Sequence, residues 1–324
     1  MSRAFVFPGQ GAQSVGMGRQ AYESGAQAIG MGRALAEAYP AAKAVFDEVD
    51  AALGENLSAL IWDGDIAELT LTRNAQPALM ATSIATLRAL EVEGFGIDHA
   101  SFVAGHSLGE YSALCAAGSL TLSDTARLLR IRGQAMQEAV PVGVGAMAAL
   151  LGLDFEAATA VAKAAAQGEV CQAANDNDPA QVVVSGHKGA IERALEIAKA
   201  KGAKRALMLP VSAPFHCALM QPAAHVMAEA LAAVPIQKPR VPVVVNVRAE
   251  AVMEPDRILD LLIAQVTGSV RWRESVLWME KAGVTEFWEI GAGKALSGMV
   301  KRCAQGEVTT RAIGTPEDIS ALKA

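Results

Sequence analysis

Residues 103–111, VAGHSLGEY, contain one serine, Ser107, with a glycine two residues to either side. The run before the serine is apolar and strand-like, and the run after it has the composition of a helix. Gly-x-Ser-x-Gly at a strand-to-helix turn is the pattern of a nucleophile elbow, a sharp turn that only small flanking residues allow. Ser107 is therefore the first candidate for a nucleophile, although ordinary turns also contain this pattern.

The composition favours an α/β protein. The chain has 324 residues, of which 52% are hydrophobic and 5% aromatic, and this suits helices packed on a sheet better than an all-β sandwich. The 28 basic and 34 acidic residues give a net charge of −6, so no overall positive field exists to hold nucleic acid. We expect a soluble α/β enzyme with no nucleic-acid partner.

The four cysteines, Cys115, Cys171, Cys217 and Cys303, form no CxxC or Cys/His pattern. Neither a disulfide framework nor a metal site is therefore predicted. The N-terminal stretch MSRAFVFPGQ lacks the apolar core of a signal peptide, and no segment reaches the roughly 18 uncharged residues that a membrane helix needs. We expect a cytoplasmic protein that does not bind a membrane.

Strands and helices alternate in most of the chain. Residues 3–7 form an apolar run that stops at a Pro-Gly pair, which indicates a buried strand ending in a loop. A helix is predicted over 77–93, with Pro77 at its start. Further strands are expected at 101–107, 241–247 and 285–291, and further helices at 34–53, 109–120 and 123–139.

The pattern changes after residue 144 to the order β-α-β-β-α-β. The strands are predicted at 145–153, 169–175, 181–186 and 203–209, the helices at 154–167 and 188–201, and a turn at 176–180. This order and length are typical of a ferredoxin-like unit. We therefore predict a discontinuous large α/β domain, residues 1–138 and 212–324, that contains a ferredoxin-like subdomain at 139–211.

A short repeat lies near the N-terminus. Residues 11–19, GAQSVGMGR, recur as residues 25–33, GAQAIGMGR, with seven of nine positions identical. Two copies of so short a period are too few for a solenoid. We interpret the repeat as a local tandem duplication that lengthens one loop–helix junction.

A serine nucleophile needs a base to accept its proton, and five histidines are available. His216 lies in PVSAPFHCALM, well downstream of Ser107, which is the chain order of α/β-hydrolase-type enzymes. We expect the adjoining His106 to point away across the turn. The remaining histidines have loop or helix contexts: His99, His187 and His225. Considered on its own, His216 would be interpreted as a structural histidine. Paired with Ser107, it is the predicted base.

Seven motifs support a more specific assignment. They are FPGQGAQ (7–13), NAQPALMA (74–81), GHSLGEYSAL (105–114), RG..M (132–136), NDN...QVVVSG (175–186), SAPFHCALM (212–220) and EIGAGKALSGM (289–299). In this order, over nearly the whole chain, they resemble malonyl-CoA:acyl carrier protein transacylases of bacterial fatty-acid synthesis. The resemblance implies an α/β-hydrolase-like large domain with a parallel-sheet core. It also implies malonyl-CoA and acyl carrier protein as substrates, no cofactor, and a monomer.

The family forms a malonyl-serine ester and passes the malonyl group to the phosphopantetheine thiol of the carrier protein. By resemblance, Ser107 is the nucleophile and His216 its base. The family orients this histidine with a main-chain carbonyl, which falls on Gln265 here, and such a neutral group would still select the productive tautomer. The backbone amides of Leu108 and Gln10 match the oxyanion donors.

Arg132 matches the family residue that binds the malonyl carboxylate. A guanidinium binds a carboxylate through two parallel, charge-assisted hydrogen bonds that lysine cannot form. The neighbouring Arg127 and Arg130 are predicted to be solvated on the helix face. The resemblance further implies three pocket residues, of which the last matches the pattern of malonyl-selective domains: Gln76, Asn177 and Phe215.

Two other functions remain open from the sequence. One is a thioesterase or lipase-like hydrolase with the same elbow, which would release free malonate at once. The other is a non-catalytic module that binds carrier protein. Local basic clusters are candidates for docking an acidic carrier protein. The alternative is that they are scattered solvated residues. They consist of Lys201, Lys204, Arg205, Lys301 and Arg302.

Overall fold

The computed structural model describes residues 2–10, 30–211 and 213–323. The tandem repeat predicted at 11–19 and 25–33 lies outside these residues, apart from the last four residues of its second copy.

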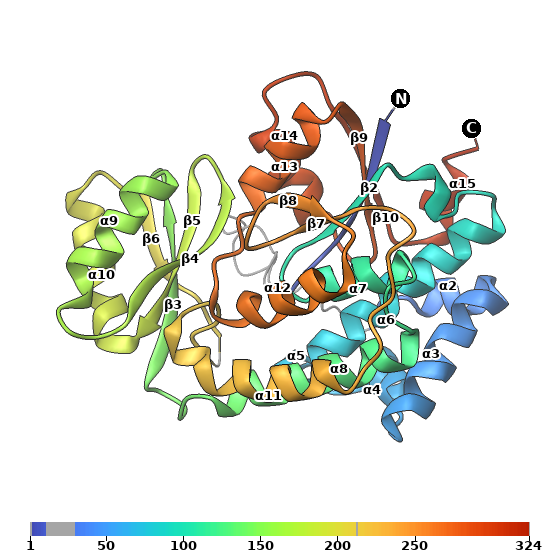
Figure 1. Ribbon diagram of the computed structural model, residues 1–324, viewed down its shortest axis with the longest axis horizontal. Coiled ribbons are helices and arrows are strands. Elements are labelled where there is room, and N and C mark those ends of the chain that lie inside the picture. Colours follow the sequence, from blue (N-terminus) through green and yellow to red (C-terminus); the bar gives the residue numbers. More distant parts are fainter. Residues whose placement is uncertain (1, 11–29, 212, 324) are drawn as a thin grey trace.

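A six-stranded sheet forms the centre of the molecule, in the order β10-β9-β1-β2-β7-β8 (Figure 1). Its first five strands are parallel, and β8 pairs antiparallel with β7 at one edge. The predicted α/β class with a parallel-sheet core is confirmed, whereas β8 and β10 were not predicted. The strands are β1 (Ser2–Phe7), β2 (Phe102–Gly105), β7 (Val243–Val245), β8 (Glu250–Val252), β9 (Val284–Ile290) and β10 (Thr309–Ile313).

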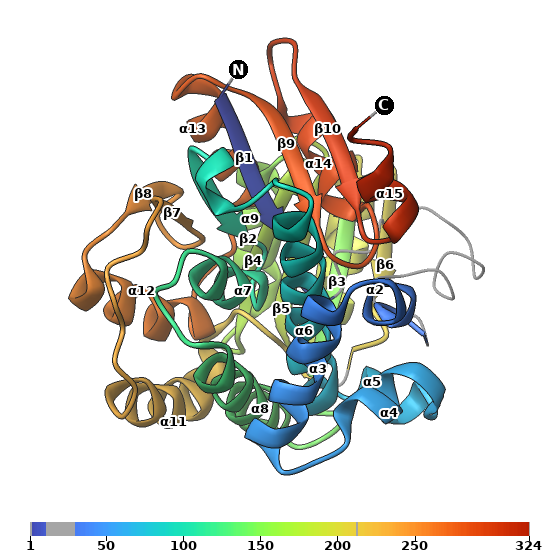
Figure 2. The ribbon, with the colours of Figure 1, turned by 90° about the vertical axis from the view of Figure 1, so that its right-hand side faces the viewer.

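Helices cover both faces of this sheet, because its inner strands are apolar on both sides. In β1, Phe5 and Phe7 pack on one face, and Ala4 and Val6 on the other. Figure 2 shows α6 on the first face with α3 and α8 beside it. The first face carries α2 (Arg33–Ala38), α3 (Pro40–Leu53), α4 (Leu57–Asp63), α5 (Ile66–Thr70), α6 (Thr72–Val92), α7 (Gly109–Ala116), α8 (Leu122–Glu138), α11 (Gln221–Ala232), α12 (Pro255–Thr267) and α15 (Pro316–Ser320). The second carries α13 (Trp272–Lys281) and α14 (Ala295–Cys303). Single 3₁₀ turns lie at Ile97–His99 and Ala218–Met220.

A second, four-stranded antiparallel sheet lies to one side of the first, in the order β4-β5-β3-β6 (Figure 1). One face packs against α9 and α10. The other face carries Met147 and Val183 toward Leu209, Val211 and Phe215. The elements are β3 (Gly145–Leu151), α9 (Phe155–Ala166), β4 (Cys171–Asp178), β5 (Gln181–His187), α10 (Lys188–Ala200) and β6 (Arg205–Met208).

The predicted helix start at Pro77 is wrong, because α6 begins at Thr72 and Pro77 lies inside it. A proline cannot donate a hydrogen bond to the carbonyl four residues before it, here that of Arg73. This carbonyl instead accepts a bond of 2.8 Å from Nη1 of Arg130. The prediction that Arg130 is solvated is therefore also wrong, since its side chain is only 14% exposed. Arg127 is exposed, as predicted.

Several further boundaries differ from the prediction, and two of these differences change the elements themselves. Residues 34–53 form two helices, α2 and α3, because Pro40 disfavours helical backbone at Tyr39, which is extended at φ −128° and ψ 111°. Strand β4 continues through Asp178, so that the turn predicted at 176–180 shrinks to the two residues between β4 and β5.

Candidate active site

Ser107 lies on the turn between β2 and α7, with a φ of 54° in the left-handed region. Glycine is needed on both sides of Ser107 because neighbouring backbone leaves no space for a Cβ. A Cβ on Gly105 would lie 1.9 Å from the carbonyl oxygen of Gly109, and a Cβ on Gly109 would lie 2.2 Å from the carbonyl oxygen of Phe7. The local sequence thus produces a strained elbow that presents the serine at the end of the parallel strands.

His216 is the histidine that contacts this serine. Its Nε2 lies 2.8 Å from Ser107 Oγ. Its Nδ1 lies 3.0 Å from the carbonyl oxygen of Gln265 and 3.1 Å from that of Gly268. Because both neighbours of Nδ1 only accept hydrogen bonds, Nδ1 carries the proton and Nε2 is left to accept one from the serine.

Burial keeps this histidine neutral. The side chain of His216 is 4% exposed, and burial, together with the nearby Arg132 and His106, lowers its pKa to about 3. The two carbonyl hydrogen bonds oppose this shift in pKa but do not outweigh it. At neutral pH, the imidazole is therefore in the form that can accept a proton.

Arg132 extends from α8 to the same point. The whole residue is only 1% exposed, so its guanidinium is buried. Nη2 donates to Ser107 Oγ at 3.1 Å and to Gln265 Oε1 at 2.8 Å, and Nη1 donates to Gln76 Oε1 at 2.8 Å. These acceptors are all neutral, so a buried positive charge stands beside the serine hydroxyl with amide and hydroxyl partners. Such a site favours an anionic ligand.

Leu108 and Gln10 both line the cleft that contains Ser107. Leu108 directly precedes the first turn of α7, where backbone N–H groups have no helical acceptor. Within the described residues, no acceptor is paired with the backbone N–H of Leu108. Gln10 follows β1, and its side chain lies 3.5 Å from both Thr70 O and Thr72 Oγ1.

The cleft lies between the two sheets, and its cavity volume is about 70 Å³. Phe215 forms part of its apolar wall, and Gln76 and Asn177 part of its polar wall. The remaining lining residues are His106, Met136, Met147, Asn175, Val183, Leu209 and Val211. The structure thus brings all the predicted site residues to one cleft, except Gln265, which lies behind it and contacts Arg132 and His216.

Comparison with known proteins assigns the family. A family model described as the acyl transferase domain matches residues 23–315. The chain belongs to the acyl transferase family. The malonyl CoA-acyl carrier protein transacylase of Bacillus subtilis is 48% identical over 317 residues, 98% of this chain and 94% of that protein. The crystal structure of an acyl-carrier-protein-S-malonyltransferase from Bartonella henselae is 51% identical with a TM-score of 0.91, covering 99% of this chain and 98% of that one.

A third relative is a malonyl-transacylase solved in complex with a type II PKS acyl-carrier protein. It is 40% identical, with a TM-score of 0.91, and the match covers 99% of this chain and 98% of that one. These comparisons make the chain an acyltransferase.

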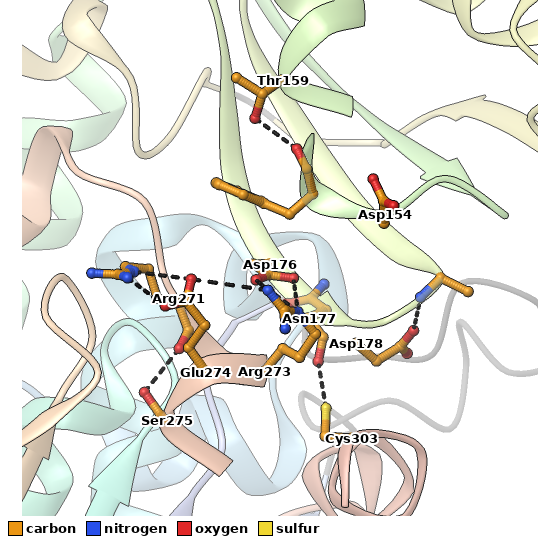
Figure 3. Close-up of polar contacts among 12 residues, drawn as sticks. Asp154, Thr159, Asp176, Asn177, Asp178, Arg271, Arg273, Glu274, Ser275 and Cys303 are labelled. Carbon is orange, nitrogen blue, oxygen red and sulfur yellow. Dashed lines mark hydrogen bonds and ion pairs between the residues drawn. The ribbon is translucent and has the colours of Figure 1, made fainter. Parts of the chain in front are cut away.

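One wall of the acyltransferase cleft is held in place by ion pairs, and Figure 3 shows the one between Asp176 and Arg273. Asp176 on β4, which is 0% exposed, pairs with Arg273 of α13 at 2.9 Å. Asp178 pairs with Arg302 of α14 at 2.7 Å. Between them, the main-chain carbonyl of Asn177 accepts a hydrogen bond from Cys303 Sγ at 3.4 Å. The acidic residues that suggested a turn instead fasten β4 to two helices of the large sheet.

His106 does not point away from the site, contrary to the prediction. It is 4% exposed and lines the cleft, and its Nε2 lies 2.9 Å from Asn177 Oδ1. The bulges in β4 bring Asn177 against the histidine. Burial lowers the pKa of His106 to about 4.

Sequence reasoning missed Glu110, Asn246 and Gly268. Glu110 is a charged residue in an otherwise apolar helical run, which is a signal that the sequence contains. Asn246 lies 139 positions from Ser107, and its Oδ1 accepts a hydrogen bond of 2.7 Å from the backbone N–H of Ser107. No spacing rule predicts such a contact. Gly268 contributes only a carbonyl oxygen, so its side-chain type carries no signal.

The described residues contain no group of three or more His, Cys, Asp or Glu side chains that could hold a metal ion. The four cysteines are buried free thiols. In the same described ranges, no helix is long and apolar enough to cross a membrane.

Proposed function

We propose that this acyltransferase moves the malonyl group of malonyl-CoA to the phosphopantetheine thiol of acyl carrier protein and so supplies fatty-acid chain elongation. The observation that carries the proposal is the buried Arg132 guanidinium, 3.1 Å from Ser107 Oγ. A malonyl ester on Ser107 has its free carboxylate within reach of this cation. The names of the close relatives in Bacillus subtilis and Bartonella henselae agree with this chemistry.

In the proposed first half-reaction, Ser107 Oγ attacks the thioester carbonyl of malonyl-CoA and gives its proton to His216 Nε2. The C–S bond then breaks, and the CoA sulfur leaves with the proton from His216. The carbonyls of Gln265 and Gly268 orient the imidazole. The second half-reaction runs the same steps in reverse with the carrier-protein thiol as nucleophile. The backbone amides of Leu108 and Gln10 stabilise the oxyanion of both tetrahedral intermediates.

The remaining pocket residues are proposed to shape the acyl site. Gln76 accepts from Arg132, so it keeps the guanidinium in place. Asn177 forms a hydrogen bond with His106, and Phe215, which directly precedes the proposed base in the chain, adds bulk to the cleft. This bulk disfavours a branched methylmalonyl group.

A serine hydrolase is the alternative enzyme on this elbow. It would need water to reach the acyl-serine. Ser107 is 9% exposed and Arg132 is 1% exposed, so the ester forms in a site with little room for water, and a hydrolase has no need for a buried cation beside its nucleophile. Both features favour transfer over hydrolysis.

We further propose the domain division predicted from the sequence: an α/β-hydrolase-like large domain, residues 1–138 and 212–324, and a ferredoxin-like insertion at 139–211. The antiparallel order β4-β5-β3-β6, with both helices on one face, supports the second part. We also propose that the enzyme acts in the cytoplasm as a monomer without a cofactor. The structural neighbour in complex with an acyl-carrier protein supports such a protein as the partner.

The test is intact-protein mass spectrometry after mixing the enzyme with malonyl-CoA in the absence of carrier protein. The wild type should show the added mass of one malonyl group, persisting until carrier protein is supplied, and Ser107→Ala should show none. An undiminished mass shift in Ser107→Ala would reject the nucleophile. Immediate release of free malonate by the wild type would favour the hydrolase.

A further inference from the structure

Glu110 is a buried carboxylate close to the active site that the reaction above does not use. It lies in the first turn of α7, three residues after Ser107, and its side chain is 0% exposed. Its Oε2 accepts two hydrogen bonds, from the backbone N–H of Asn246 at 2.9 Å and from Gln265 Nε2 at 3.0 Å. Its Oε1 has no partner among the described residues.

Both partners of Glu110 hold the peptide of the nucleophile. Asn246 Oδ1 accepts from the backbone N–H of Ser107 at 2.7 Å, and Gln265 Nε2 donates to the backbone carbonyl of Ser107 at 3.0 Å. Asn246 also donates to the carbonyl oxygen of Gly105 at 2.7 Å. Ser107 has a φ of 54°, a conformation that a non-glycine residue keeps only when its surroundings enforce it.

The same network reaches the cation of the site. The side chain of Gln265 that donates to Glu110 accepts, through Oε1, a bond of 2.8 Å from Arg132 Nη2. Glu110 is therefore one of the two acceptors, with the Ser107 carbonyl, that fix which way the Gln265 amide faces. A rotated amide would present its NH₂ group to Arg132, so that two donors would oppose each other.

We propose that Glu110 is a positioning residue: through Asn246 and Gln265, it holds the strained Ser107 peptide and the Arg132 guanidinium in their reactive arrangement. This inference rests on the proposed malonyl transfer. A carboxylate is costly to bury, and here one of its oxygens joins the two residues that clamp the nucleophile from both sides.

Two substitutions separate geometry from charge. Glu110→Gln removes the charge but keeps an oxygen at the same reach, which can still accept both hydrogen bonds. Glu110→Asp keeps the charge, but its shorter side chain cannot reach Asn246 and Gln265 together. We expect Glu110→Gln to acylate at close to the wild-type rate, and Glu110→Asp to lose about 100-fold in the single-turnover rate with malonyl-CoA, as is usual for a displaced reacting group.

The second readout is substrate preference, which a purely structural defect would not change. Because Glu110→Asp also removes one of the two acceptors that orient the Gln265 amide toward Arg132, the ratio of malonyl to acetyl acylation should fall by about tenfold, the usual effect of losing a hydrogen bond to a charged group. The matched control is Glu289→Asp. Glu289 is likewise 0% exposed, but it binds the backbone N–H groups of Leu296 and Ser297 in α14. This control should keep the wild-type ratio.

Folding is checked by circular dichroism and thermal melting, and rates are taken from rapid-quench mass spectrometry. A folded Glu110→Asp with the wild-type rate and ratio overturns the proposal, as does an active Glu110→Asp beside an inactive Glu110→Gln. If Glu110→Asp does not fold, Glu110→Gln decides: a retained rate and ratio support the proposal, and a large loss overturns it. If the wild type forms no malonyl ester, both the proposed function and this inference are overturned. If the wild type forms the ester, a negative result with the Glu110 variants overturns only the role of Glu110.

Discussion

Arg132 introduces a full positive charge into the site. Its hydrogen-bond partners are neutral: Gln76, Ser107 and Gln265. Burial lowers its pKa from the usual value, but a guanidinium stays protonated at any pH at which the protein works. The free enzyme therefore holds a desolvated cation without a directly bonded anion. In the proposed function, the malonyl carboxylate is the anion that would pair with this cation.

Arg132→Ala should remove the preference for malonyl. The malonyl carboxylate would then be buried without a partner, at a cost of about 3–5 kcal/mol. Malonyl transfer should fall by at least about 100-fold, whereas acetyl transfer should survive or rise, because acetyl has no carboxylate to bury. Arg132→Lys should restore little, since an ammonium lacks the planar fork. The measurement is the ratio of malonyl to acetyl turnover. Equal losses of both activities would move the carboxylate site to another residue.

The pH dependence of acylation in the folded enzyme should reflect His216, the proposed base. Its folded pKa of about 3 lies below the ordinary value of 6.5, so the base stays neutral throughout mildly acidic pH. The charged or titratable groups that face it are Arg132 and His106. Burial also raises the pKa of the nearby Glu110 to about 7, but a proton on its unbonded Oε1 leaves both bonds to Oε2 intact. We therefore expect the acylation rate to change little between pH 8 and about pH 5.

Stability determines what happens at lower pH. His106 and His216 both have lowered folded pKa values, so the unfolded chain binds protons there that the folded chain does not. Their contribution to stability is complete above pH 6.5 and is lost as the pH falls toward 3. Activity should therefore be lost at the pH at which the protein unfolds. Unfolding is monitored by circular dichroism at each pH and compared with the acylation rate. A tenfold fall in rate between about pH 7.5 and 5.5 in a folded enzyme would point to another base.

Among the elements, β4 connects the two sheets. Its Asp176 and Asp178 pair with α13 and α14, and a parallel bridge joins Asn175 to Val270. The same strand presents Asn177 to His106 in the cleft. The position of this wall therefore depends on contacts made by the residues on either side of Asn177.

Arg273→Ala should destabilise the protein by about 3 kcal/mol, because it leaves the buried Asp176 carboxylate without its bidentate partner. The measurement is the free energy of unfolding in urea. Lys199→Ala is the control: its pair with Glu196 is exposed, so the loss should stay below about 1 kcal/mol. Equal, small effects of both substitutions would show that the Asp176 pair does not hold the strand.

At the scale of the whole molecule, the cleft is built from both sheets. The large sheet supplies Ser107 through its elbow, and the small sheet supplies Met147 and Val183. One short segment contacts both units: Gly268 O binds His216, and two residues later Val270 pairs with β4. The orientation of the His216 imidazole and the position of the small sheet are thus linked by the same stretch of chain.

Docking of an acidic carrier protein should depend on exposed basic residues near this cleft. The sequence suggested Lys301 and Arg302 together, but Arg302 binds Asp178, so reversing its charge would also disturb β4. Lys301→Glu is the sharper change, since Lys301 is exposed on α14. It should raise the KM for carrier protein, leave that for malonyl-CoA unchanged, and lose its effect in high salt. Equal changes in both KM values would exclude Lys301 from the docking surface.

Local sequence determined the features that depend on neighbouring residues. Gly105 and Gly109 specify the elbow at Ser107 because a Cβ at either position would overlap backbone. The five residues 105–109 are therefore enough to predict the turn. Apolar runs likewise predicted the inner strands of the parallel sheet, since burial on both faces demands them. The family motifs extended the prediction to His216 and Arg132, which no local rule connects to the serine.

Only the tertiary structure decided how distant residues complete the site. Pro77 sits inside α6 because Arg130, from another helix, satisfies the carbonyl that proline leaves free. The acidic stretch of β4 stays extended because Arg273 and Arg302 neutralise it from α13 and α14. Glu110 acquires its role from partners 136 and 155 positions away. The physical reason is common to all three: a buried polar group is stable only when partners satisfy it, and in this protein those partners come from elsewhere in the fold.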